Sequence, residues 1–241
     1  GVVLSHMAIL HNLEAALELL NDFNIDKERF ISFLPLSHSY ERMAGLFFPL
    51  LIKAEIYFCS SLDKLLMEIK EIRPTIFSAV PRLYENIYKK IKSKLRNSSK
   101  IEKFIMRKVF NYLENEKQNF TTNILGKIFL RIVIQKKVMS SFGGCIKALI
   151  SGGAALSPQI GGFFNKMGFN LLQGYGQTEA APLIACNKRK YNDPKTVGFP
   201  VKNVEVKISS ENEILVKGNN VMIGYWRKKK LTEETIKNKW L

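Results

Sequence analysis

One segment of the chain, Gln173-Gly-Tyr-Gly-Gln-Thr-Glu179, combines residue types that could bind a phosphorylated ligand. Its two glycines would let the backbone approach a ligand closely, and the tyrosine between them would offer a ring for stacking. Thr178 and Glu179 add a hydroxyl and a carboxylate, which suit a phosphate oxygen and the Mg²⁺ that accompanies it. Taken alone, the segment is equally compatible with an ordinary glycine-rich turn whose Thr-Glu pair faces solvent.

A second glycine-rich segment, Ser151-Gly-Gly-Ala-Ala155, lies upstream of the first. Each segment follows a short apolar run that predicts a strand, at residues 146–150 and 169–173. In an open α/β sheet, ligands bind beyond the carboxyl ends of the strands, so both segments are expected to face one crevice. Their co-occurrence favours a nucleotide site.

The segments that must position this site alternate between helix and strand. A helix is expected after Ser5, which is a suitable N-cap. Apolar residues at three- and four-residue steps predict its buried face, namely Met7, Leu10, Leu13, Leu17 and Leu20. Further strands are predicted at 30–34, 55–59, 75–80, 204–208 and 213–216, and further helices at 43–52, 62–72 and from Ser157-Pro158 onward. This alternation predicts an α/β fold with mostly parallel layered sheets and covering helices.

A strongly basic helical stretch is expected between residues 82 and 140, where strand patterns disappear. The chain has 241 residues and a formal net charge of +16, and most of the excess lies in this stretch. One interpretation is a solvated helical face; the other is an arm that lies on an anionic membrane surface. The stretch has no RNP-type or other known stacking motif, so no nucleic-acid partner is expected.

Composition limits the remaining possibilities. Hydrophobic residues make up 46% and charged residues 24%, which excludes a disordered or collagen-like chain. The longest uncharged apolar run, residues 43–52, is roughly half of the ~20 residues that a membrane-spanning helix needs. The three cysteines, Cys59, Cys145 and Cys186, are widely spaced, which indicates reduced thiols in the cytoplasm and no zinc or disulfide framework.

These motifs together resemble the adenylate-forming (AMP-binding) acyl-CoA synthetases, and within them the long-chain fatty-acid–CoA ligases. The resemblance covers nearly the whole chain in family order, and only the basic stretch has no motif. It is carried by Phe33-Leu-Pro-Leu-Ser-His-Ser-Tyr-Glu-Arg42, Val80-Pro-Arg-Leu-Tyr-Glu85, Ser151-Gly-Gly-Ala-Ala-Leu-Ser157, Gln173 to Glu179, Thr196-Val-Gly-Phe-Pro200, Glu213-Ile-Leu-Val-Lys-Gly218 and Val221-Met-Ile-Gly-Tyr-Trp226.

The resemblance implies roles for the residues after the second predicted strand of the site. Tyr175 would stack on adenine, Thr178 would contact the α-phosphate, and Glu179 would bind Mg²⁺. Gln173 and Gly174, with Gly176 beside them, would approach the adenine and the acyl carboxylate.

The resemblance also implies roles for two other segments. Gly152, Gly153 and Ala154 would form a backbone wall between the adenine and the acyl pocket. His38 would lie near the pyrophosphate and the acyl entrance, and it joins Thr178 and Glu179 as a catalytic candidate. Taken alone, a histidine at this position would more often be a loop residue bonded to the backbone.

The activity implied by the resemblance is the activation of a long-chain fatty acid. The carboxylate would attack the α-phosphorus of Mg·ATP to give acyl-AMP and pyrophosphate, and the thiol of coenzyme A would then displace AMP. Core phenylalanines are candidates for an acyl tunnel, although simple core packing is the commoner role: Phe47, Phe48, Phe77, Phe163 and Phe164. The alternatives are another acyl- or aryl-adenylating enzyme, or a non-catalytic remnant of a split gene.

The resemblance divides the chain at residue 200. Residues 1–200 would form the α/β core of the AMP-binding domain, with residues 82–140 as a basic helical insertion, and residues 201–241 would start a β-rich subdomain. The phosphate-cradling loop is expected before Gly1, and the ribose-binding aspartate and the small C-terminal domain after Leu241. The chain would then hold the middle of an active site and is expected to be inactive by itself.

Overall fold

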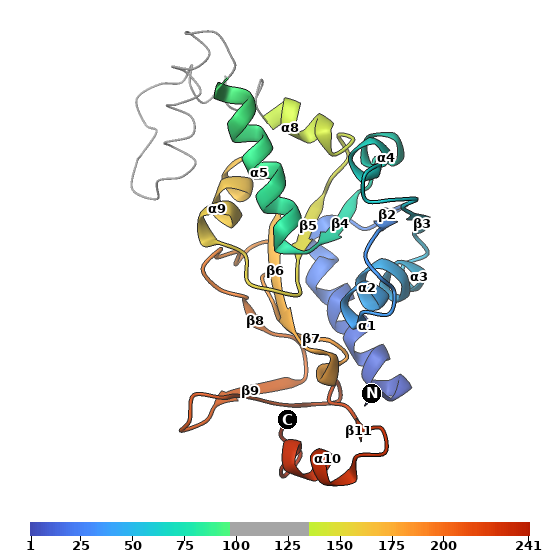
Figure 1. Cartoon of the computed structure of the whole chain (residues 1–241), viewed down its shortest axis with the longest axis vertical. Helices are drawn as coiled ribbons and strands as arrows, with labels where there is room; N and C mark the ends of the chain where they lie inside the picture. Colours follow the sequence, from blue (N-terminus) through green and yellow to red (C-terminus); the bar gives the residue numbers. More distant parts are fainter. Residues whose placement is uncertain (97–134) are drawn as a thin grey trace.

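The computed structural model describes residues 1–96 and 135–241, and its centre is a five-stranded sheet in the order β4-β5-β6-β7-β8 (Figure 1). Strands β4 (Ile76–Ala79), β5 (Ala148–Ser151) and β6 (Leu171–Gly176) are parallel. Strands β7 (Leu183–Cys186) and β8 (Phe199–Pro200) continue the sheet antiparallel. The α/β class is confirmed and the sheet is mixed, because only the short turn η4 (Thr178–Ala180) joins β6 to β7, whereas parallel pairing needs a long crossover.

A parallel pair of strands, β2 (Arg29–Ser32) and β3 (Glu55–Phe58), lies beside the central sheet. The backbone N–H of Thr75 donates to the carbonyl of Arg29 at 2.9 Å, and the N–H of Arg29 donates to Thr75 Oγ1 at 2.9 Å. These bonds join β2 to the start of β4. The predicted strands at 30–34, 55–59 and 75–80 are therefore confirmed with small shifts of their ends.

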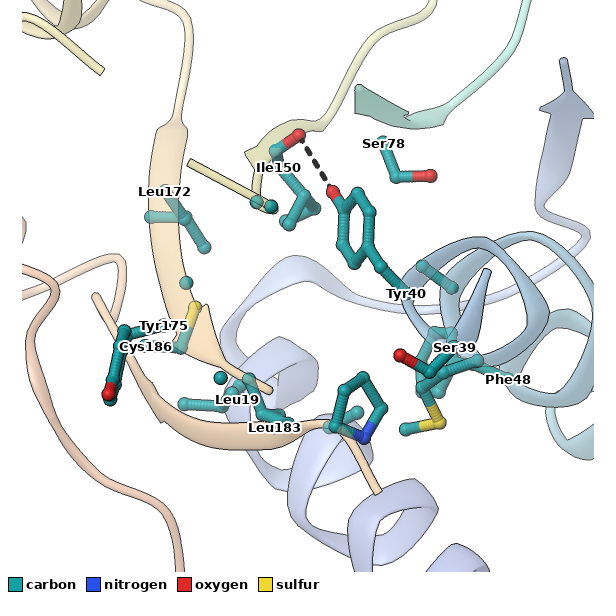
Figure 2. A pocket seen from close by; sticks show the side chains of 18 of the residues that line it. Leu19, Ser39, Tyr40, Phe48, Ser78, Ile150, Leu172, Tyr175, Leu183 and Cys186 are labelled. Carbon is teal, nitrogen blue, oxygen red and sulfur yellow. Dashed lines mark hydrogen bonds between the residues drawn. The ribbon is translucent and has the colours of Figure 1, made fainter. Parts of the chain in front are cut away.

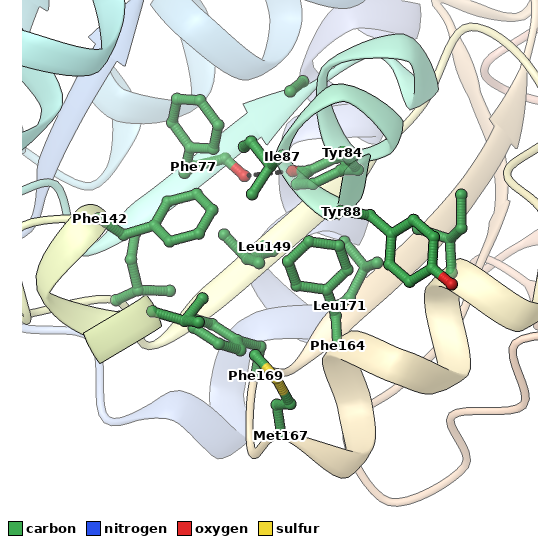
Figure 3. Packing of buried hydrophobic residues seen from close by; sticks show 14 of the residues in the cluster. Phe77, Tyr84, Ile87, Tyr88, Phe142, Leu149, Phe164, Met167, Phe169 and Leu171 are labelled. Atoms are coloured by element: carbon green, nitrogen blue, oxygen red, sulfur yellow. Dashed lines mark hydrogen bonds between the residues drawn. The ribbon is translucent and has the colours of Figure 1, made fainter. Parts of the chain in front are cut away.

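Helices cover both faces of the central sheet. Helices α4 (Leu65–Ile72), α5 (Pro81–Arg96), α8 (Lys136–Ser141) and α9 (Pro158–Lys166) pack on one face, where Phe77, Leu149 and Leu171 point (Figure 3). The neighbouring residues Ile76, Ala148 and Leu172 point to the other face, against α1 (His6–Leu20) and the segment 42–51. This alternation is the two-residue period of buried strands, and it separates the core into two clusters.

Helix α1 begins at the predicted N-cap, where Ser5 Oγ accepts from the N–H of Ala8 at 2.9 Å. The prediction of its buried face was partly wrong. Leu13 and Leu20 are buried, but Met7, Leu10 and Leu17 are exposed by 63%, 50% and 37%. Besides leucines, the buried face carries small and polar residues: Ala8, His11, Asn12 and Ala15.

The predicted helix at 43–52 is a helical segment in three parts, α2 (Ser39–Glu41), the π-helical turn η2 (Arg42–Phe47) and α3 (Phe48–Leu51). It is buried only in part, since Leu50 and Leu51 are exposed. A π-turn inserts an extra residue and is frequent at functional sites. Its position next to His38 puts it in the wall of the cavity described below.

The last part of the chain contains short antiparallel pairs. The predicted β segments are confirmed as the hairpin of β9 (Val204–Ile208) and β10 (Ile214–Gly218), and Asn212 in its turn has a φ of +64°. Strand β11 (Gly224–Tyr225) pairs with β1 (Val2–Val3), and α10 (Lys229–Thr235) follows. The 3₁₀ turn η1 (Asn21–Phe23) ends α1.

Three further predictions concern the basic stretch, the cysteines and membrane-spanning helices. The middle of the expected basic helical stretch, residues 97–134, lies outside the described residues. The three cysteines are free thiols. None of the described helices has the length and apolar character needed to cross a membrane.

Candidate active site

A cavity of about 350 Å³ lies between α1, the segment 38–48 and the central sheet (Figure 2). It is reached by the glycine-rich segments after β5 and at the end of β6, so the expected crevice exists. Most of its lining is apolar, and this part comes from α1, β2, η2, α3, β6 and β7: Ala16, Leu19, Leu20, Phe30, Met43, Ala44, Phe48, Leu172 and Leu183.

Most of the predicted site residues line this one cavity. They are His38, Gly152, Gly153, Gly174, Tyr175, Gly176, Thr178 and Glu179. The glycines Gly174 and Gly176 lie within strand β6, paired with β7, and do not form the glycine-rich turn that the pattern suggested. The strand therefore runs directly to Gln177 and places Thr178 and Glu179, in η4, in the lining of the cavity.

Two predicted residues, Ala154 and Gln173, do not line the cavity. The buried side chain of Gln173 accepts from the N–H of Leu156 at 3.2 Å and donates to the carbonyl of Pro194 at 2.8 Å. Both ends of the amide are thus engaged in joining two loops. Gln173 braces the site from outside the cavity, and its amide does not point to a ligand there.

Tyr40, which sequence reasoning did not select, fills the space beside Gly152. A Cβ added to Gly152 would lie 2.8 Å from Cε2 of Tyr40, so this position requires glycine. The ring faces the cavity, while the hydroxyl donates to the carbonyl of Ile150 at 3.4 Å (Figure 2). Desolvation of this hydroxyl beneath the strands raises the pKa of Tyr40 well above its ordinary value, so the phenol stays neutral. The glycine pair after β5 was the available signal for such a close contact.

The segment 38–40 and the turn after β6 meet through a hydrogen bond that joins two distant motifs. The hydroxyls of Ser39 and Thr178 are 3.0 Å apart. His38 Nδ1 accepts from the N–H of Tyr40 at 3.2 Å, which makes His38 the cap of α2. Both interpretations of His38 therefore hold, because its Nδ1 is bound to the backbone and the residue also lines the cavity.

Glu179 presents a half-buried carboxylate that is held by a residue far along the chain. The hydroxyl of Tyr225 donates to Glu179 Oε1 at 3.0 Å. Desolvation, and then the hydrogen bond and negative charge of Glu179, raise the pKa of Tyr225 above its ordinary value. The phenol is therefore protonated and acts as a donor at neutral pH. No local sequence pattern connects these two residues.

The turn that follows Glu179 is held by the buried side chain of Asn12 on α1. Its Oδ1 accepts from the N–H of Leu183 at 2.6 Å, and its Nδ2 donates to the carbonyls of Ala180 and Leu183 at 3.2 and 3.4 Å. Asn220 Nδ2 also donates to the carbonyl of Leu183, at 3.1 Å. Because Leu183 lines the cavity, these amides fix part of its wall.

A buried carboxyl group, Glu41, lies next to the cavity wall. Its Oε1 accepts from Ser32 Oγ at 2.7 Å and from the N–H of Phe33 at 3.2 Å, whereas Oε2 has no partner in the described part of the chain. Burial raises the pKa of Glu41 above its ordinary value, although both hydrogen bonds act in the opposite direction. The carboxyl thus favours its neutral form more than an exposed glutamate does.

The proposed tunnel phenylalanines separate into two groups. Phe48 lines the cavity and Phe47 packs against the same cluster. Phe77, Phe163 and Phe164 are fully buried on the opposite face of the sheet, where Phe164 packs edge-on against Tyr84 (Figure 3). These three are core residues, as the alternative interpretation predicts.

The donor set of the site fits a cation that arrives with a nucleotide. No group of three or more His, Cys, Asp or Glu side chains is positioned to hold a metal within residues 1–96 and 135–241. One carboxylate, Glu179, stands beside one hydroxyl, Thr178, on the cavity wall. Mg²⁺ is typically bound by one or two carboxylates together with substrate phosphates and water, so this set suits a metal–nucleotide complex.

Comparisons with known proteins agree with this geometry. A family model described as AMP-binding enzyme matches residues 1–226. Long chain acyl-CoA synthetase 4 of Arabidopsis thaliana is 28% identical over 260 residues, which cover 100% of this chain and 39% of that protein. A long-chain-fatty-acid–CoA ligase of Mycobacterium bovis is 28% identical over 247 residues, covering 100% and 40%.

Solved structures share the fold. O-succinylbenzoate coenzyme A synthetase from Bacillus subtilis, in complex with ATP and a magnesium ion, has a TM-score of 0.67 at 18% identity and covers 100% of this chain and 43% of its own. The N-terminal domain of FACL13 from Mycobacterium tuberculosis has a TM-score of 0.68 at 16% identity and covers 100% and 53%. The chain spans about 40% of the length of the curated relatives that it matches. Because the family model matches almost the whole chain, the chain belongs to the AMP-binding family of adenylate-forming enzymes.

Proposed function

We propose that the full-length protein containing this chain activates a fatty acid with ATP and transfers the acyl group to coenzyme A. One observation carries the proposal: Tyr175, Thr178 and Glu179 line the same cavity as the Gly152-Gly153 backbone and a large apolar wall. A nucleotide and an apolar acid could therefore meet in it. The coenzyme A synthetase from Bacillus subtilis that shares this fold was solved with ATP and magnesium, and also with AMP.

The proposed chemistry has two steps. A carboxylate oxygen of the acid attacks the α-phosphorus of ATP, and pyrophosphate leaves; the thiol sulfur of coenzyme A then attacks the acyl carbon, and AMP leaves. Thr178 would donate its hydroxyl to the α-phosphate, and Tyr175 would hold the adenine. Gly152 and Gly153 would keep side chains out of the reacting space, and His38 would lie at the pyrophosphate side. Positioning and charge neutralisation account for most of the catalysis of such transfers.

Magnesium would be held by Glu179 together with the phosphates. When bound, it would neutralise charge on the phosphate oxygens and on the leaving pyrophosphate. The contribution of the chain itself is one carboxylate on the cavity wall, which Tyr225 holds, next to Thr178. This arrangement supports ATP as a co-substrate and Mg²⁺ as the cofactor, and the names of the relatives support coenzyme A as the second co-substrate.

The apolar wall supports an acid with a hydrocarbon body. Side chains such as Leu19, Met43 and Leu172 offer no polar group to a ligand, so a hydrocarbon chain would be favoured there over a polar acid. The names of the relatives support long-chain fatty acids within this class. An aryl acid is the competing substrate, because an aromatic ring would also suit such a wall.

ATP–pyrophosphate exchange in the full-length protein tests this proposal. Exchange should depend on an added acid, rise from short to long saturated acids, and be weak with aryl acids. Addition of coenzyme A should then yield the matching acyl-CoA. Exchange with none of these acids would overturn the proposed function, and a preference for aryl acids would leave adenylation intact but reject the fatty-acid assignment.

A peripheral contact with anionic membranes is the second part of this proposal. On α5, Tyr84 and Tyr88 are buried, whereas Lys89 and Lys90 face outward. We expect Lys89→Gln/Lys90→Gln to reduce co-sedimentation with vesicles that contain anionic lipid, most clearly at low salt. The matched control is Lys228→Gln/Lys229→Gln, since these exposed lysines lie at and beside α10, at the other end of the molecule (Figure 1). Equal pelleting of both variants and the wild type would reject the contact.

A further inference from the structure

We propose that Tyr225 is a positioning residue that fixes the carboxylate of Glu179 for the cation of a metal–nucleotide complex. The inference rests on the proposed function, because it assigns a task to Tyr225 only if Glu179 receives that cation. Tyr225 itself contacts no reacting group in this assignment. It acts through Glu179.

The segment that contains Tyr225 holds Glu179 at both of its ends. The Tyr225 hydroxyl binds Oε1 of the side chain at 3.0 Å, and the N–H of Met222 donates to the carbonyl oxygen of Glu179 at 2.8 Å. The main chain and the carboxylate of one residue are thus bound by positions only three apart in sequence. A carboxylate with this support keeps one orientation, whereas an unsupported one rotates among several.

The position of Tyr225 is itself set by tertiary structure. Its strand β11 pairs with β1, with Tyr225 opposite Val2, and its N–H donates to Thr232 Oγ1 on α10 at 2.9 Å. Gly224 allows this contact, since its φ is +153° and an added Cβ would lie 2.6 Å from Thr232 Cγ2. The phenol therefore comes from a backbone fixed on two sides.

The bond from Tyr225 divides the carboxylate into two oxygens with different tasks. Oε1 receives the phenol, and Oε2 has no hydrogen-bond partner among the residues that the structure describes. Oε2 is thereby left for the cation. Hydrogen-bond partners of metal-bound carboxylates orient the ligand and tune its affinity, which is the effect expected of Tyr225.

The variant Tyr225→Phe tests this assignment, because it keeps the ring and removes only the hydroxyl. The matched control is Tyr57→Phe: the Tyr57 hydroxyl makes a similar bond, to Glu55 Oε2 at 2.9 Å, on β3 away from the cavity. The readout is binding by calorimetry in the full-length protein, with Mn²⁺ plus ATP in one series and AMP with EDTA in the other. Thermal unfolding of each variant reports whether the fold is retained.

We expect Tyr225→Phe to weaken Mn·ATP binding about tenfold while AMP binding without metal changes less than about twofold. Tyr57→Phe should change neither. In a Glu179→Gln background, Tyr225→Phe should have no further effect on Mn·ATP binding, since the carboxylate that it positions is gone. Unchanged Mn·ATP binding in Tyr225→Phe, or an equal loss of AMP binding, would overturn the assignment. If the wild type binds no Mn·ATP, or Glu179→Gln binds it normally, the proposed function fails instead.

Discussion

The negative charge of Glu179 is the feature of a single residue on which the proposed chemistry depends most. Glu179→Gln keeps the size of the side chain and removes its charge. We expect ATP–pyrophosphate exchange at limiting Mg²⁺ to fall by at least about tenfold, with little change in affinity for the acid. Thr178→Val, which loses only the hydroxyl, tests the phosphate contact separately in the same assay.

The control for Glu179→Gln is Glu211→Gln, which removes an exposed charge between β9 and β10. This variant should exchange pyrophosphate like the wild type. Wild-type exchange by Glu179→Gln at limiting Mg²⁺ would contradict the metal role and favour a solvent-facing turn.

The site residues that could be predicted from sequence are those whose local motif alone indicates which contact they make. Gly152 and Tyr175 belong to local patterns in which glycine implies close approach and an aromatic ring implies stacking, and both line the cavity. Tyr225 was missed because its bond to Glu179 joins positions 46 apart. Gln173 was predicted to approach the ligand, but its side chain bonds to two loops instead. Sequence patterns do not predict such a side-chain direction, because it depends on loops from other parts of the chain.

At the scale of elements, α1 holds the turn after β6 through Asn12. Asn12→Ala would leave the partly buried N–H of Leu183 and the partner carbonyls of Asn12 without these bonds, so we expect a loss of about 1–3 kcal/mol in the free energy of unfolding. Denaturant unfolding would measure it. Asn86→Ala on the exposed side of α5 is the control and should change stability by less than about 0.5 kcal/mol. A loss no larger than that of the control would show that Asn12 does not hold the turn.

The helical segment 39–51 gives stability a pH dependence through Glu41. Its folded-state pKa is raised above the ordinary 4.5, so the folded state binds the proton more tightly than the unfolded state. The resulting stabilisation is complete below about pH 4.5 and is lost as pH rises through the folded-state pKa. Glu41→Gln, which does not titrate, should therefore gain stability relative to the wild type as pH is raised from 4.5. A difference in the free energy of unfolding between the two proteins that stays constant across this pH range would contradict the raised pKa.

Element type was easier to predict than element orientation. Alternation of apolar runs located most strands and helices, because burial on both faces of a sheet leaves short continuous apolar stretches. The buried face of α1 was misjudged, since Met7 and Leu10 satisfy the helical period yet are exposed, while Asn12 is buried by its hydrogen bonds. The spacing of apolar residues does not predict the burial of a polar residue whose hydrogen-bond partners come from distant parts of the chain.

At the scale of the whole molecule, the central sheet separates a tightly packed core from a cavity. Aromatic side chains fill the face under α5 and α9, while the face under α1 leaves room beside Tyr40 and the glycine-rich segments. Periodicity predicts both faces as apolar and cannot say which one is hollow. The small residues Ala16 and Ala44 line the cavity on the hollow side.

The most direct test of the proposed adenylate site is a crystal structure of the full-length protein with a non-hydrolysable fatty acyl-AMP analogue, in which a sulfamoyl group replaces the acyl phosphate. We expect the adenine against Tyr175, the sulfamoyl group near Thr178, and the acyl chain along the wall formed by Leu19, Met43 and Leu172. An analogue bound outside this cavity, or no binding at concentrations that saturate acyl-adenylate enzymes, would contradict it.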